Sequence, residues 1–138
     1  MEDDKDIKVM VEKRRVTYPR VDNDENAMKI INAEIMITKE TEIKIKFTYP
    51  LSHTVTLEFK NPNGFNQKDF FLAVQQGYRQ IYKEEDDVVG DPGTITPHML
   101  NRARSKGPHG IWGHYIGDLF LEGYEEESPG IFSLSMGS

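Results

Sequence analysis

The chain has 138 residues, no cysteine and a formal net charge of −6 at neutral pH. This length is typical of one domain that buries a core without disulfides or metals. The missing thiols exclude disulfide frameworks, cysteine–zinc sites and cysteine nucleophiles, and the acidic balance disfavours a general nucleic-acid binder.

The first residues differ in composition from the rest. Residues 1–6 are acidic and polar, and we expect them to form a disordered tip ahead of a single domain over 7–138. They lack the basic-then-apolar layout of a secretory signal. Apolar runs all fall short of the ~18–20 residues that cross a bilayer. The sequence therefore predicts a soluble, intracellular, cytoplasmic protein without membrane contact.

Alternating hydrophobic residues predict strands in the first half of the chain. The three later runs are joined by short connections, so they predict an antiparallel meander with one buried face. Residues 24–32 also allow a short helix, which Asn23 or Asp24 could cap. The four period-two runs cover 7–11, 31–37, 43–47 and 55–59.

The clearest helix is predicted over 66–84. Asn66 is a favourable N-cap, and Asp69 three residues later completes a capping box. Apolar residues then recur at helical spacing. Gly77 costs this helix ~1 kcal/mol relative to alanine, which we attribute to close packing on the sheet. The acidic run 84–87 is interpreted as a solvated loop, with a cation site as the alternative.

In the second half, Thr96-Pro97 predicts a short helix that ends near Ser105. Residues 115–120 could include one further helical turn. Two final strands are predicted over 119–121 and 131–134, separated by a turn at Ser128-Pro129-Gly130. The predicted fold is therefore α+β. An antiparallel sheet of about five strands packs on one long helix, with a second short helix beside it.

The stretch 107–122 is where we expect a rigid, specific structure, because it holds the only tryptophan and four of the eleven glycines. Trp112 is interpreted first as a core residue that closes one face of the sheet. The alternative is an anchor for a protein partner, since tryptophan and tyrosine are enriched in binding hot spots. The candidate partner surface consists of Trp112, Tyr115, Arg102 and Arg104.

Two further functions are considered. His109, His114 and Asp118 are candidate metal ligands of a hydrolase-like enzyme, because imidazole and carboxylate groups suit zinc, iron or manganese. No established ligand motif or nucleophile motif accompanies them. A basic patch over 98–109, followed by Trp112, suggests binding of single-stranded nucleic acid.

The main functional prediction is a small non-enzymatic protein, without a cofactor, that binds or supports other proteins through surface contacts. Self-association is included, because an open sheet edge would allow a homodimer. Nucleic acid is not expected as the partner, and the sequence identifies no small molecule.

The segment 109–123 resembles a pattern found in small uncharacterised proteins of large DNA viruses, plants and protists. That pattern is Gly-Ile-Trp-Gly-His, two or three residues, then Asp-Leu and an apolar–acidic pair, matched here over 110–122. The run 78–85 resembles the same proteins. The resemblance implies a viral or eukaryotic setting, in the cytoplasm of an infected cell or in a virion. It assigns no activity to any residue.

Overall fold

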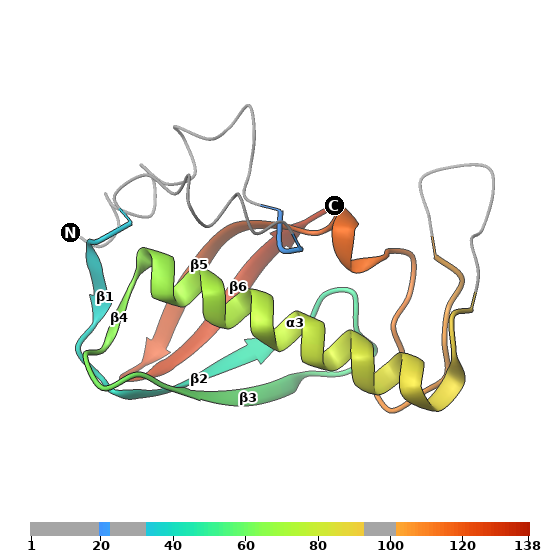
Figure 1. The fold of residues 1–138 in the computed structure, drawn as a ribbon, viewed down its shortest axis with the longest axis horizontal. Helices are drawn as coiled ribbons and strands as arrows, with labels where there is room; N and C mark the ends of the chain where they lie inside the picture. The colour runs from blue at the N-terminus through green and yellow to red at the C-terminus, as the bar shows by residue number, and fades with distance from the viewer. Residues whose placement is uncertain (1–19, 23–32, 93–101) are drawn as a thin grey trace.

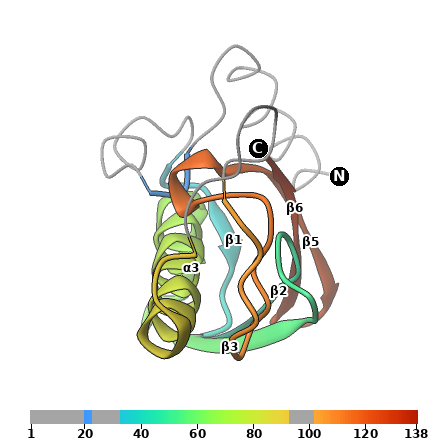
Figure 2. The same cartoon turned by 90° about the vertical axis from the view of Figure 1, so that its right-hand side faces the viewer.

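The computed structural model describes residues 20–22, 33–92 and 102–138. The predicted acidic tip, the strand over 7–11 and the alternative helix over 24–32 lie outside these ranges. The long helix runs along the sheet (Figure 1), which curves around it when seen from the end (Figure 2). In chain order the described elements are β1 (Met36–Thr38), β2 (Glu42–Phe47), β3 (Val55–Lys60), β4 (Phe65–Asn66), α3 (Gln67–Val89), the 3-10 helix η1 (Ile116–Asp118), β5 (Phe120–Ser128) and β6 (Ile131–Gly137).

The main sheet has four strands among the described residues, in the order β3-β2-β6-β5. Two antiparallel hairpins, β2–β3 and β5–β6, meet at its centre, where β2 runs parallel to β6 and Lys44 lies opposite Ile131. β1 pairs with β4 in a separate two-stranded sheet. The α+β class is confirmed. The predicted antiparallel sheet of about five strands is matched only in part, because the described strands divide between two sheets and β2 pairs with β6 in parallel.

The first strand of the predicted meander, over 31–37, is wrong in its described part, because its backbone carbonyls accept hydrogen bonds from the first residues of α3. The amide of Gln67 donates to the carbonyl of Ile35, and the amide of Lys68 donates to the carbonyl of Ala33. Regular strand structure therefore begins only at Met36 and continues next to β4, not next to β2.

The start of α3 confirms the predicted capping box. The Asn66 side chain accepts a hydrogen bond from the amide of Asp69, and the Asp69 carboxylate accepts one from the amide of Asn66. The helix then continues to Val89, beyond the predicted end at 84. Its buried face packs on the sheet, where the ring of Phe70 lies 5.1 Å from that of Phe132 on β6.

The second helix, predicted to end near Ser105, is not formed in its described part. Arg102 bridges to Gly113, and the amide of Ser105 donates to the carbonyl of Ile111. Residues 102–105 thus run antiparallel to 111–113, as the two sides of a loop. The rest of that predicted helix lies outside the described residues, and the short helix seen in the described part is η1.

Gly77 lies where α3 crosses β2. A Cβ atom added to Gly77 would overlap the ring of Phe47. That ring also meets Tyr78 edge-on, with 4.9 Å between centroids. The predicted close packing at this glycine is therefore confirmed, because the helix approaches the sheet too closely for any side chain.

We expect Gly77→Ala to lower the free energy of unfolding by about 1–2 kcal/mol, because overpacking against Phe47 outweighs the ~1 kcal/mol gained in helix propensity. Urea denaturation measures this difference. Gly117→Ala is the matched control, since a Cβ there would meet nothing within 4 Å. Equal effects of the two substitutions would contradict the packing explanation.

Candidate functional site

The carboxylate of Glu85, on α3, holds the loop over residues 105–111 through hydrogen bonds. Glu85 is 0 % exposed. Burial alone would raise the pKa of this carboxyl, but the hydrogen bonds it accepts hold the pKa below its ordinary value. Glu85 is therefore ionised at neutral pH. It accepts from the hydroxyl of Ser105 at 2.5 Å and from the amides of His109, Gly107 and Ile111 at 2.7, 3.0 and 3.3 Å.

The acidic neighbours of Glu85 bind the same loop. Glu84 lies 2.7 Å from Nε2 of His109, a hydrogen bond that lowers the pKa of Glu84. Asp86 accepts from the guanidinium of Arg102 at 2.9 Å. The solvated-loop interpretation of 84–87 is therefore wrong. Negative charge is unfavourable near a helix C-terminus, but here three consecutive carboxylates are stabilised by donors from the loop.

Gly107 shows how closely the loop approaches this carboxylate. A Cβ atom on Gly107 would lie 2.7 Å from the carboxyl carbon of Glu85. Any side chain at 107 would displace Glu85 or break the hydrogen bond from the Gly107 amide. The glycine-rich composition of this stretch thus has a structural cause in at least this position.

Arg102 was predicted to contribute to a partner surface, and this prediction is wrong. Its side chain is 1 % exposed. The guanidinium carbon lies 5.4 and 5.6 Å from the ring centroids of Tyr82 and Tyr115, and the guanidinium also pairs with Asp86. A buried charge is costly unless it is paired, and the ion pair with Asp86 meets this requirement. Arg102 therefore has a structural role inside the fold.

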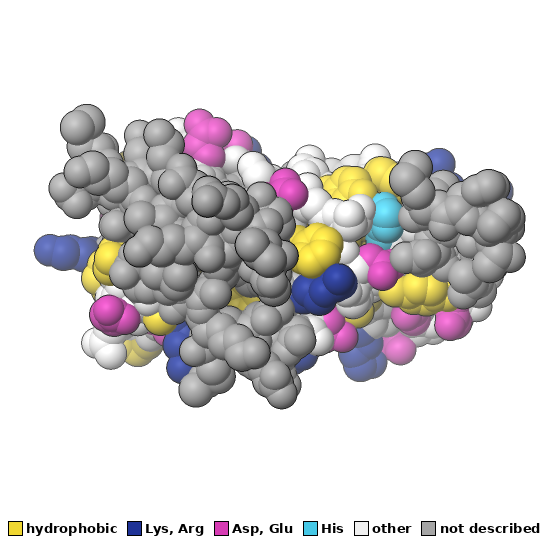
Figure 3. Space-filling view, turned by 90° about the horizontal axis from the view of Figure 1, so that it is seen from above, with side chains coloured by type: hydrophobic (Ala, Val, Ile, Leu, Met, Phe, Trp, Pro, Cys, Tyr) yellow, Lys and Arg dark blue, Asp and Glu magenta, His cyan; other side chains and the backbone are white. Residues whose placement is uncertain are grey.

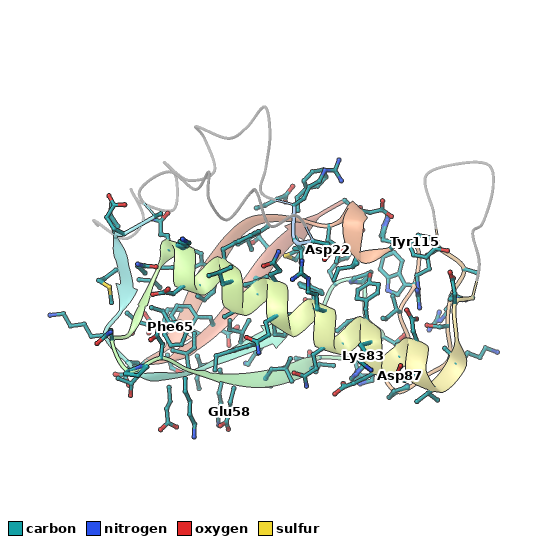
Figure 4. All side chains as sticks on the ribbon, viewed as in Figure 1. Asp22, Glu58, Phe65, Lys83, Asp87 and Tyr115 are labelled. Carbon is teal, nitrogen blue, oxygen red and sulfur yellow. The ribbon has the colours of Figure 1, made fainter. Side chains whose placement is uncertain are left out.

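The other three residues of the predicted partner surface retain exposed area. Arg104 is exposed and donates to the hydroxyl of Ser52 at 3.1 Å. Trp112 and Tyr115 are half-buried, and Figure 4 shows Tyr115 beside the loop at the C-terminal end of α3. The Trp112 ring contacts Tyr49 edge-on, with 5.2 Å between centroids. Trp112 therefore packs at the margin of the core and does not fill it.

His114 lies next to this tryptophan and is 7 % exposed. Its Nε2 atom shares hydrogen bonds with the hydroxyls of Tyr49 at 2.7 Å and Ser138 at 3.2 Å. Burial lowers the pKa of His114, and the charge of Asp118 only partly opposes this effect. His114 is therefore neutral at pH 7. Figure 3 shows a histidine at the surface among hydrophobic and acidic side chains.

The three candidate metal ligands have separate partners. His109 contacts Glu84, His114 contacts Tyr49, and Asp118 accepts from the amide of Tyr115 at the start of η1. Within 20–22, 33–92 and 102–138, no three histidine, aspartate or glutamate side chains form a group that could hold a metal ion. In the basic 98–109 patch, Arg102 and His109 are paired with acidic residues of α3.

A groove of about 330 Å³ lies between β3 and the first half of α3. Figure 4 shows Phe65 on the helix side of β3, whereas Glu58 points away from the helix. Leu72 is 39 % exposed. The helix wall of this groove is formed by Asp69, Leu72, Ala73 and Gln76, and the rest by Glu58, Phe59, Lys60, Asn61 and Phe65.

The strand beside this groove is an edge strand, because β3 pairs only with β2 among the described strands. The amide of Asn61 donates to the carbonyl of Thr41, so these two residues form a hydrogen-bonded pair next to the strands. Along an antiparallel ladder, hydrogen-bonded pairs alternate with pairs whose amides and carbonyls point away from the partner strand. The residues of β3 that bond to β2 are therefore 55, 57 and 59. The outward amides and carbonyls of β3 therefore belong to Thr56, Glu58 and Lys60.

The alternating run 55–59 predicts β3 as a strand, but the amino-acid pattern gives no sign of this groove. The run 55–59 alternates regularly, and such a pattern is the same in an edge strand and in a central strand. The helix wall was also hidden. Residues 69, 72, 73 and 76 share one face by helical spacing, but the sequence does not show that this face borders β3, because that depends on the orientation of α3 on the sheet. The described helices include none that could span a membrane.

We expect Glu85→Gln to lower the free energy of unfolding at neutral pH by about 2–3 kcal/mol, because an amide cannot accept from all four donors. The native pKa of Glu85 is depressed, so the stabilisation is complete above the ordinary glutamate pKa and is lost as pH falls through the native pKa. The difference between the two proteins should therefore shrink in acid. Urea denaturation over a pH series measures it, with exposed Glu125→Gln as control. A difference that does not change with pH would contradict this assignment.

Comparisons with known proteins contribute no relative. No family model matches the chain, and no match was found among curated proteins or solved structures. The functional assignment therefore depends on the geometry of the chain itself.

Proposed function

We propose that this protein is a protein-binding domain that receives an extended segment of its partner along β3, in the groove beside α3. The observation that carries the proposal is the juxtaposition of the outer edge of β3, which pairs with no described strand other than β2, with a groove walled by the helix. This mode of recognition is β-strand addition, in which main-chain hydrogen bonds supply affinity and pockets for alternate side chains supply specificity.

The backbone of β3 defines the shape of the occupant. Thr56, Glu58 and Lys60 each present an amide and a carbonyl to the groove side of the strand. Only another extended chain can pair with successive groups at this spacing. A partner helix would satisfy its own backbone groups and leave those of β3 without partners.

The side chains of the groove define the chemistry of the occupant. Phe59, Phe65 and Leu72 supply apolar surface, and Asp69 and Gln76 add polar groups on the helix side. A bound strand would direct every second side chain towards this surface and the others away from it. The proposed ligand is therefore an extended segment that alternates apolar and polar residues.

Selection of peptides from a random display library on the folded chain tests this proposal. We expect the selected peptides to bind at least tenfold more weakly to Leu72→Arg, which fills the groove with a charged side chain, as judged by fluorescence polarisation. Glu58→Pro should have a similar effect, because proline removes an outward amide that β2 does not use.

Val89→Arg is the matched control, because Val89 is 40 % exposed on the same helix and does not line the groove. Nuclear magnetic resonance shifts on peptide addition should be centred on the amides of Thr56, Glu58 and Lys60. Equal binding by all three variants, or shifts centred on Trp112, would show that the groove is not the binding surface.

A further inference from the structure

We infer that the strand received by β3 is β3 of a second copy of this chain, in an antiparallel homodimer in which Glu58 of each copy lies opposite Lys60 of the other. This inference rests on the proposed function, since it uses the same edge and groove. It differs in committing to one partner and to one register.

The charges of β2 and β3 favour this register. Within the chain, Glu42 lies opposite Lys60 and Lys44 lies opposite Glu58, all on the face directed away from α3. Pairing Glu58 with the partner's Lys60 continues each row across the seam, so that positive and negative residues alternate over four strands. Opposite charges directly across two strands are stabilising, and like charges are destabilising.

On the face of the sheet directed towards α3, the same register brings apolar side chains together. The residue between Glu58 and Lys60 is Phe59, which lies opposite Ile43 on β2 and packs against the core. In the dimer it would face Phe59 of the other copy, and the two-fold axis would place both α3 helices on this side of the sheet. Leu72, exposed in the groove wall, would then lie above the paired rings.

Other registers that use the same outward backbone groups are less favourable. Centring the pairing on Glu58 places this carboxylate opposite its own copy. Moving the centre to Leu57 removes the opposite-charge pairs, because Glu58 then faces Thr56 and Lys60 faces Thr54. The register centred on Phe59 is the one that matches both faces of the strand.

Charge reversal provides the test, measured by sedimentation velocity over a wide range of concentration. We expect a concentration-dependent dimer for the unmodified chain. Glu58→Lys alone and Lys60→Glu alone should each weaken the dimer about tenfold or more, because each creates two like-charge pairs across the seam. The double variant E58K/K60E should recover the dimer.

Mixing the two single variants gives the sharpest readout. One chain then carries two lysines and the other two glutamates, so both seam pairs become complementary in a heterodimer. Because lysine and glutamate differ little in mass, one variant is labelled uniformly with ¹⁵N, and native mass spectrometry then distinguishes the heterodimer from both homodimers. We expect this heterodimer in the mixture. Loss of folding cannot imitate the result, because the same two preparations are monomeric apart and paired together.

Three results would overturn the inference: a monomer at every concentration, single variants that dimerise like the unmodified chain, or a mixture without the heterodimer. A monomer that still binds displayed peptides in a manner sensitive to Leu72→Arg would overturn self-pairing and leave the proposed function intact. Failure of both experiments would reject the β3 edge as a binding surface altogether.

Discussion

The buried carboxylate of Glu85 is the interaction on which the loop at the C-terminal end of α3 depends. It accepts four hydrogen bonds from a loop that has no regular secondary structure of its own around residues 105–111. An isolated buried charge is costly, and four donors compensate for that cost. Because three of these donors are backbone amides, the path of the loop is specified by one side chain of the helix.

This arrangement assigns the two unusual stretches of the sequence to one structure. The acidic run at the end of α3 and the glycine-rich run around Trp112 are about twenty residues apart in the chain. The second run supplies hydrogen-bond donors, and the first supplies the carboxylates that accept them. Arg102 forms an ion pair with Asp86, and His109 forms a hydrogen bond with Glu84, the two neighbours of Glu85. The residues that first suggested a binding surface or a metal site are therefore largely occupied in holding the fold together. The surface that we propose for a partner lies elsewhere, along β3.

Local sequence signals predicted local structure well. The capping box at Asn66, the β2–β3 alternation and the close approach at Gly77 were all recognisable, because each depends on residues near one another in the chain or on one strong steric requirement. The failures were non-local. The parallel pairing of β2 with β6, the diversion of β1 to β4 and the burial of Glu85 depend on contacts between distant segments. A charged residue next to other charged residues carries no local sign that it will be buried.

The parallel seam between β2 and β6 has a consequence for how the chain folds. Each hairpin, β2–β3 and β5–β6, pairs residues that are close in sequence, so its loop-closure entropy is small. The seam pairs Lys44 with Ile131, and these residues are far apart in the sequence because α3 and the Glu85 loop lie between them in the chain. Pairings of such long range form slowly. The two hairpins can therefore form early and independently, and the union of the sheet becomes the step that makes the whole domain cooperative.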